Sequence, residues 1–263
     1  MANERAWGRE RSVELGTGRR PRRTRAYLLR AIDYRDADRI VTLLTRDFGR
    51  LSAVARNARR SRKRFGGSLE SFMELDVELR WGRGDLATLG SAAVAQAHLG
   101  LVADLRRMRC AGACLELVRL LAPEREPEPR LFEAVGAMLE TIEASAPEEA
   151  ADRGLSFCAR ALAIVGWAPD LETCGVTGRR CPPEQPAFFD PKRGTIVARS
   201  AGGGPLLLHG DTRRTLRASF EDPSLRIGWS PRARQEAADA IRGLVRAHLD
   251  RELSSAWARA LGG

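Results

Sequence analysis

The string MELDVELRW at residues 73–81 constrains the fold more than any other part of the sequence. Five apolar residues alternate strictly with four charged ones along it. Successive side chains of a β-strand point to opposite faces, so this pattern places every apolar side chain on one face and every charge on the other. A half-buried strand of an antiparallel sheet requires that arrangement, and a helix could not sort these residues in the same way.

Further strands are predicted around this one. Apolar and β-branched runs bounded by turn residues indicate strands at Arg25–Asp33, Arg39–Thr45, Arg50–Ala55 and Leu86–Gln96. Five short strands with one longer excursion, between the third and the fourth, suit an OB-fold barrel, whose central strands and neighbouring loops bind oligonucleotides. An SH3-like barrel of five strands would give a similar string, and counting strands does not separate the two.

From about Leu99 the spacing of apolar residues changes from two to 3.6, which indicates helices. Helices are predicted at residues 99–121, 131–144, 147–166, 212–220 and 231–261. The string EREPEP after Pro123 is read as a linker, and residues 168–205, rich in proline and glycine, as an irregular loop. The predicted fold class is therefore α+β, with an N-terminal five-stranded OB-fold barrel (24–97) followed by an all-α domain (98–263) that the irregular loop interrupts. Residues 1–23 are expected to form a disordered basic arm.

Positive charge is concentrated in one stretch of the chain. The chain has a formal net charge of +10, and Arg46–Phe65 alone holds eight basic residues and one acidic residue. Asn57–Phe65 has too few apolar residues to be buried, so it is predicted to be an exposed basic loop. Its natural counterpart is a phosphate backbone, where each neutralised phosphate releases a counterion. The alternative is a solvated, charged loop in an arginine-rich chain.

These charges supply the candidate contact residues. We expect nine basic side chains to bind nucleic acid, namely Arg35, Arg39, Arg46, Arg56, Arg59, Arg60, Arg62, Lys63 and Arg64. Four aromatic residues near them are candidates for stacking on bases, although a barrel core also needs aromatic side chains: Tyr27, Tyr34, Phe65 and Phe72.

The sequence offers little for catalysis. It has no glycine-rich phosphate loop, no convincing Ser/His/Asp or Cys/His arrangement, and no carboxylate cluster suited to the metal ions of a nuclease. We therefore predict a protein that is not an enzyme and holds no cofactor. No apolar run reaches transmembrane length, no signal peptide is seen, and the five cysteines lack a disulfide framework, so a cytoplasmic location without membrane association is expected.

The order of several motifs points to a family. The strings are AYLL at 26–29, YRDADRIVTLLTR at 34–46, FGRL at 48–51, AVARNARR at 53–60 and, near the end, HLDRELSS at 248–255. In these the chain resembles the RecO family of bacterial DNA repair proteins. The resemblance implies an OB-fold and a helical domain in a nucleoid-associated recombination mediator. Such a protein binds single- and double-stranded DNA, anneals complementary strands, and acts with RecR and single-strand-binding protein to load RecA. A protein-interaction adaptor whose basic loop is incidental remains the alternative.

The resemblance also implies a position for a zinc module, because many family members carry four cysteines there. Cys174 matches the first ligand, but Thr177 stands at the second, and Val197 and Ser200 stand where the later pair would fall. Cys181 does not restore the spacing. A structural zinc ion needs four ligands, so the sequence argues against a bound metal.

We predict that the purified protein contains no stoichiometric zinc. Three of the four cysteine ligands are replaced, so the loop must hold its shape by packing. Elemental analysis of the purified chain tests this. About one zinc ion per chain, removable only with loss of folding, would show the prediction to be wrong.

Overall fold

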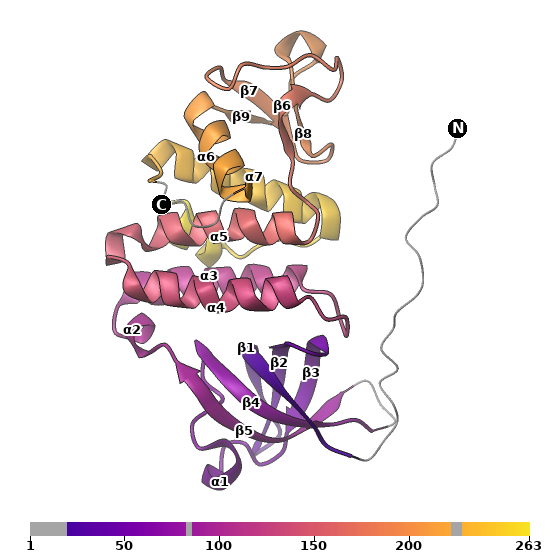
Figure 1. Cartoon of the computed structure of the whole chain (residues 1–263), viewed down its shortest axis with the longest axis vertical. Helices are drawn as coiled ribbons and strands as arrows, with labels where there is room; N and C mark the ends of the chain where they lie inside the picture. Colours follow the sequence, from indigo (N-terminus) through magenta and orange to yellow (C-terminus); the bar gives the residue numbers. More distant parts are fainter. Residues whose placement is uncertain (1–19, 83–85, 222–227) are drawn as a thin grey trace, which may run out of the picture. The chain divides into compact units, whose positions relative to one another are not determined.

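The structure is a computed structural model that describes residues 20–82, 86–221 and 228–263, apart from the side chains of Arg62 and Lys63. It divides into two compact units (Figure 1). One contains the chain up to Gln96 together with Pro123–Pro129, and the other contains Ala97–Ala122 and Arg130–Gly263. Most of the expected basic arm lies outside the described residues, but its last two residues already belong to the first strand.

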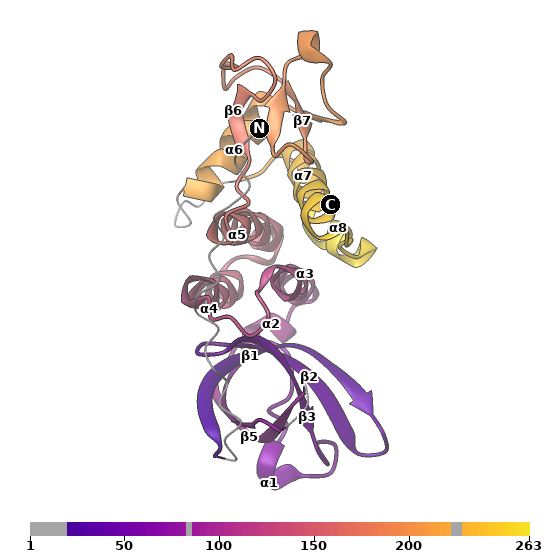
Figure 2. The ribbon, with the colours of Figure 1, turned by 90° about the vertical axis from the view of Figure 1, so that its right-hand side faces the viewer.

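The first unit is a closed barrel of five strands. They are β1 (Arg22–Tyr34), β2 (Asp38–Thr45), β3 (Gly49–Ala55), β4 (Met73–Arg80) and β5 (Ala87–Ala97), with the four-residue helix α1 (Arg62–Phe65) between β3 and β4. The order around the barrel is β1-β2-β3-β5-β4, with β3 parallel to β5 and β1 antiparallel to β4 (Figure 2). This OB-fold-like order confirms the predicted barrel and removes the SH3-like alternative.

The alternating strand fills the barrel as its sequence predicts. Leu75, Val77 and Leu79 of β4 are at most 1% exposed, whereas Asp76 between them lies in solvent. Burying each such aliphatic side chain contributes about 2 kcal/mol. The rest of the barrel core comes from the inward faces of the other strands and from Phe65 and Leu69 of the segment that links β3 to β4.

Strand β1 contains an irregularity that changes which face its residues occupy. Leu28 pairs with Leu43, but Arg30 pairs with the next residue, Thr42, so Leu29 is an additional residue on β1. Such a bulge shifts the alternation of side chains by one position. Even-numbered residues of β1 therefore point into the barrel before the bulge and away from it afterwards.

The expected linker after Pro123 is part of the barrel unit. The Arg50 N–H donates to the Pro123 carbonyl at 3.1 Å, and the Arg125 N–H donates to the Arg50 carbonyl at 2.9 Å, which adds a short parallel bridge to β3. Gly49 allows this approach, because it has a φ of 65° and a Cβ there would lie 2.1 Å from the Glu126 carbonyl oxygen. The sequence of this segment suggested only a linker, because pairing through the backbone requires no pattern of apolar side chains.

The second unit is built on helices α2 (Leu99–Val102), α3 (Leu105–Leu121), α4 (Pro129–Ala144), α5 (Ala150–Ile164), α6 (Gly210–Glu221), α7 (Pro231–Leu249) and α8 (Ser255–Leu261). Helix α5 packs against α3 and α6. Gly154 permits close packing, because a Cβ there would lie 2.6 Å from Leu261 Cδ2. Among the described residues, no helix is both long enough and apolar enough to cross a membrane.

Two predicted helices are interrupted. The helix expected at 99–121 breaks before Asp104, whose carboxylate accepts the backbone N–H groups of Arg106 and Arg107 as an N-cap. The helix expected at 231–261 ends at Asp250, which has a φ of 51°, and a new helix begins after Ser254, whose hydroxyl caps the N–H of Trp257. Apolar spacing continues across both breaks, so periodicity alone could not find them.

The prediction of an irregular loop at 168–205 was wrong. These residues and the ones just after them form a four-stranded sheet of β6 (Asp170–Cys174), β8 (Thr195–Val197), β7 (Ala187–Asp190) and β9 (Leu206–Leu208), in that order. Its apolar centre includes Phe189 and Ile196, both almost fully buried. The expected all-α domain is therefore a helical unit that carries a small sheet. Strands of three to five residues are too short to show an alternating pattern, which explains the error.

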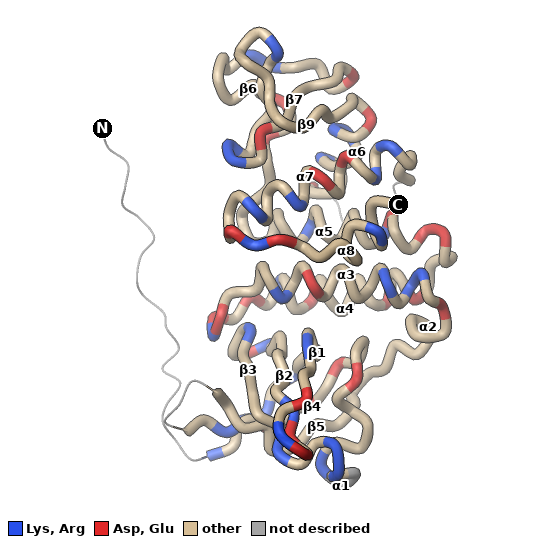
Figure 3. The backbone as a smooth tube through the Cα atoms, turned by 180° about the vertical axis from the view of Figure 1, so that it is seen from behind, with Lys and Arg blue, Asp and Glu red and all other residues tan. Residues whose placement is uncertain are grey.

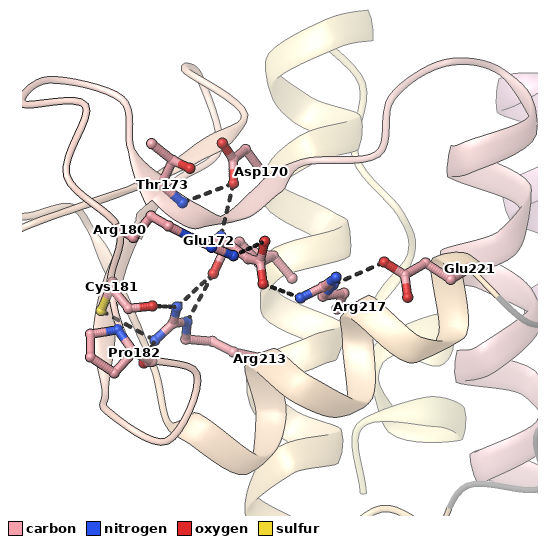
Figure 4. Close-up of polar contacts among 10 residues, drawn as sticks. Asp170, Glu172, Thr173, Arg180, Cys181, Pro182, Arg213, Arg217 and Glu221 are labelled. Atoms are coloured by element: carbon pink, nitrogen blue, oxygen red, sulfur yellow. Dashed lines mark hydrogen bonds and ion pairs between the residues drawn. The ribbon is translucent and has the colours of Figure 1, made fainter.

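A buried arginine holds this small sheet to the helices. Arg213 of α6 is 2% exposed, and its guanidinium donates to the carbonyls of Leu171, Cys181, Pro182 and Gln185 at 2.7–3.1 Å. Figure 4 shows this arginine beside Cys181 and Pro182. One planar cation thereby satisfies the carbonyls of β6 and of the turn at residues 181–185. Next to it, Arg217 pairs with both Glu172 and Glu221 at the surface.

We predict that Arg213→Met lowers the free energy of unfolding by about 3 kcal/mol, because it leaves several buried carbonyls without donors. Urea denaturation followed by circular dichroism measures this. Arg214→Met is the matched control, since Arg214 is exposed on the same helix and its replacement should change stability little. Equal stability of the two variants would contradict the role given to Arg213.

Candidate nucleic-acid interface

The basic loop is attached to the turn between β1 and β2. The Arg59 N–H donates to the Ala37 carbonyl at 3.1 Å, and the Asn57 N–H donates to the Asp38 carboxylate at 2.8 Å. Arg35 and Asn57 both adopt the left-handed backbone region, with φ values of 55° and 56°. These contacts join two segments about twenty residues apart into one surface, which we call the hairpin–loop junction (residues 34–39 and 56–64).

Apolar anchors fix the far side of the loop. Phe65, at the end of α1, is 2% exposed, and Leu69 is 4% exposed within the barrel core. The Ser68 hydroxyl donates to the Ala92 carbonyl of β5 at 3.1 Å. The stretch Asn57–Phe65 is therefore exposed or half-buried over most of its described length, as expected of a basic loop, and its last residue, Phe65, anchors it in the barrel core.

The candidate arginines of the junction are not equivalent. Arg35, Arg56, Arg59 and Arg60 are exposed at its surface. Arg59 lies 3.9 Å from the Asp33 carboxylate with its side chain 49% exposed, so this ion pair is weak and solvated. These four guanidiniums can therefore reach an external anion.

Two other candidates are held by the protein. Arg39 pairs with Asp33 at 3.1 Å and with Glu70 at 3.7 Å, and its side chain is 29% exposed. Arg64 donates to the Arg56 carbonyl at 2.8 Å and lies over the Phe65 ring. Both therefore brace the junction, and a shallow cleft of about 270 Å³ lies between Arg39 and Phe65.

The remaining candidates fall elsewhere. Arg46 follows the end of β2 opposite to the junction, where its N–H donates to the Arg25 carbonyl, so the structure does not bring it together with the others. The backbones of Arg62 and Lys63 lie in α1, but their side chains are outside the described residues. Basic residues are gathered at α1, whereas most of the charged residues of β4 are acidic (Figure 3).

Burial separates the four aromatic candidates. Tyr27, Phe65 and Phe72 are at most 7% exposed, whereas Tyr34 is 39% exposed at the end of β1. Phe65 packs in the barrel core, whereas Tyr27 and Phe72 are buried outside that core. Arg30 is exposed on the same strand, and sequence reasoning missed it because the bulge that turns it outward leaves no local signature.

The zinc-module position contains one unusual thiol. Cys174 is buried and free, and its sulfur accepts the backbone N–H of Ala198 at 3.2 Å. Hydrogen bonds to the sulfur lower the pKa of Cys174 to about 6. The Ala198 N–H has the largest effect, and the hydroxyl and N–H of Thr177 and the N–H of Val176 contribute less. Among the described residues, no three metal-ligating side chains lie close enough together to hold an ion. The turn therefore directs hydrogen-bond donors at the Cys174 sulfur, which has no cluster of metal-ligating side chains around it among the described residues.

Comparison with known proteins identifies the family. The model named "Recombination protein O N terminal" matches residues 20–98, and "Recombination protein O C terminal" matches residues 102–256. The chain belongs to the RecO family. A DNA repair protein RecO of Anaeromyxobacter sp. (strain K) is 39% identical over 237 residues, covering 87% of this chain and 91% of the relative. RecO of Geobacter metallireducens is 35% identical, covering 89% and 94% of the two chains.

The resemblance drawn from the motif order is thus confirmed over most of the chain. RecO of Myxococcus xanthus, at 33% identity over 88% of this chain and 93% of its own, extends the same match. Membership of the RecO family establishes a general role in DNA repair. The two matched regions correspond to the barrel and to the helical unit with its small sheet.

The lowered pKa of Cys174 predicts a pH-dependent contribution to stability. The thiol has a pKa of about 6 when folded and about 8.5 when unfolded, so between these values only the unfolded chain binds the proton. Stability from this group therefore rises with pH across that window and is lost as pH falls through about 6.

Urea denaturation of the protein and of Cys174→Ser at pH 6 and pH 9 measures this contribution. The stability difference between the two should be larger at pH 9, since other titrating groups are common to both. The same difference at both pH values would contradict the thiolate assignment.

Proposed function

We propose that this protein binds single- and double-stranded DNA through the hairpin–loop junction, anneals complementary strands, and, with RecR and single-strand-binding protein, helps load RecA. The observation that carries the proposal is the gathering of exposed arginines from two separate segments at one end of an OB-fold-like barrel. Barrels of this kind bind oligonucleotides on the central strands and adjoining loops. Family membership supplies the repair context.

The exposed arginines of the junction suit phosphate rather than bases. Arg56, Arg59 and Arg60 present planar guanidiniums, which bind phosphate oxygens in pairs of hydrogen bonds. Phosphate contacts position a protein without reading sequence. Two complementary strands repel each other through their phosphates, so a surface that neutralises phosphates on one strand lowers the barrier to pairing with a second.

We propose that the protein acts without catalysing a covalent step. Its described residues contain no cluster of metal-ligating carboxylates, and the surfaces with notable chemistry are a cationic junction and an apolar groove. The proposed contact residues are Arg35, Arg56, Arg59 and Arg60 at the surface, with Arg39 and Arg64 as braces. Arg62 and Lys63 are included from the sequence.

A second candidate function, a protein-interaction adaptor, is favoured by the helical unit. A groove of about 930 Å³ is lined by α4 and α5, with apolar side chains such as Met138, Phe157 and Ile164. Arg153 and Arg160 also line it. A groove lined by both apolar and charged side chains is suited to a peptide segment of a partner protein. In the adaptor case the barrel arginines would contribute nothing to DNA binding.

We predict that Arg59→Glu/Arg60→Glu weakens binding of single-stranded and duplex DNA and abolishes strand annealing. Removal of each phosphate-binding arginine should reduce the slope of log affinity against log salt by about one unit. Fluorescence anisotropy at several salt concentrations measures affinity and slope, and an annealing assay with and without single-strand-binding protein measures the activity.

The matched control is Arg106→Glu/Arg214→Glu, which changes the net charge equally at two exposed arginines of the helical unit. It should keep the parental slope, and both variants should melt like the parent protein. If the junction variant also keeps the parental affinity and slope, the adaptor function is favoured and the proposed interface is wrong.

A further inference from the structure

The outer face of the barrel carries an apolar strip that the phosphate interface does not use. Ile32 of β1 pairs with Ile40 of β2, and Ile40 pairs with Val54 of β3, so the three residues form a row across neighbouring strands. Ile32 is 41% exposed, and the other two are half-buried. Side chains directly opposite each other on one face of a sheet lie in contact distance, so the row is continuous.

The bulge at Leu29 creates this strip. Before the bulge Ala26 and Leu28 face the core, and an uninterrupted alternation would also turn Ile32 and Tyr34 toward that side. The additional residue reverses the alternation, so Arg30, Ile32 and Tyr34 face outward. A bulge disrupts the hydrogen-bond ladder between two strands. Here it exposes Ile32 and Tyr34 next to arginine side chains.

Tyr34 lies at the end of the strip, where the strip meets the hairpin–loop junction. Its ring is 39% exposed, and the Arg35 guanidinium lies 5.1 Å from the ring centre. The same face continues to Arg30, which pairs in register with Thr42. A flat aromatic surface is therefore flanked by exposed arginines of β1, the turn and the basic loop.

We propose that Tyr34, with the Ile32–Ile40–Val54 strip beside it, is a base-stacking platform that makes the protein prefer single-stranded over duplex DNA. The inference rests on the proposed DNA binding and adds a residue that distinguishes the two forms of DNA. Unpaired bases expose their flat faces, which stack on aromatic rings and apolar side chains whatever the base. A duplex hides those faces and offers the platform only its phosphates.

Charge complementarity selects nucleic acid as the occupant of this surface. The exposed guanidiniums of Arg30, Arg35 and Arg56 border the strip, and each can neutralise a phosphate of a strand whose bases lie on the apolar row. A base on Tyr34 would lie next to Arg35, which combines stacking with a cation at one position. An apolar partner surface would instead leave these charges desolvated without partners.

The test compares Tyr34→Ala with Tyr34→Trp in the full chain by fluorescence anisotropy on a single-stranded oligonucleotide and on a duplex of the same length. Tyr34→Ala should weaken single-strand binding about tenfold and leave duplex binding within about twofold, whereas Tyr34→Trp should retain single-strand binding. The salt slope should stay parental for both variants, because stacking releases no counterions. Leu207→Ala, at a residue 43% exposed on the small sheet, is the matched control and should have no effect.

A strand with abasic sites provides a second measurement. It removes the stacking partners, so the parent protein and Tyr34→Ala should bind it equally. If Tyr34→Ala keeps the parental affinity for single-stranded DNA, or loses affinity equally for single-stranded and duplex DNA, the platform is wrong. The phosphate interface would still stand if the arginine variants reduce the slope of log affinity against log salt. Failure of the parent protein to bind either DNA would overturn both proposals.

Discussion

The pairing of β1 with two partners is the constraint on which the barrel depends. Ala26 lies opposite Thr45 of β2 on one side and opposite Leu75 of β4 on the other, which closes the sheet. Closure places apolar side chains of all five strands inside the barrel, and the charged face of β4 lies outside it. The antiparallel order of β1, β2 and β3 brings the turn after β1 and the loop after β3 to the same end of the barrel. The hairpin–loop junction lies there.

The charged junction shows how a folded protein keeps like charges together. Phe65 and Leu69 anchor the loop in the core, and Asp33 neutralises part of the charge by pairing with Arg39 and, more distantly, with Arg59. Backbone hydrogen bonds to Ala37 and Asp38 hold the loop in place without using the arginine side chains. The backbone from which the exposed arginines project is therefore positioned before any ligand arrives, which reduces the entropy cost of ordering the loop on binding.

The small sheet of the second unit is organised by hydrogen bonds at the position where the family resemblance implies a zinc module. Arg213 satisfies four carbonyls from inside, and the turn after β6 directs N–H groups at the sulfur of Cys174. Both devices depend on buried polar groups that are fully partnered, since an unpartnered group there would be costly. They give a physical account of how the sheet can keep its shape with a single cysteine among the four positions that such a module would use.

The barrel, the helical periodicity of the second half and the family could all be predicted from the sequence. Alternation in Met73–Arg80 could be satisfied only by a half-buried strand, and the arginines around residue 60 could not be placed in a core. The sequence could not supply the short strands β6–β9, the helix breaks at Asp104 and Asp250, or the attachment of Pro123–Pro129 to β3. These depend on backbone hydrogen bonds, side-chain caps and local backbone angles rather than on apolar spacing. The tertiary structure also decided which candidates share a surface. Arg39 and Arg46 lie at opposite ends of β2. In β1, the bulge turns Tyr34 outward, whereas Tyr27 is buried.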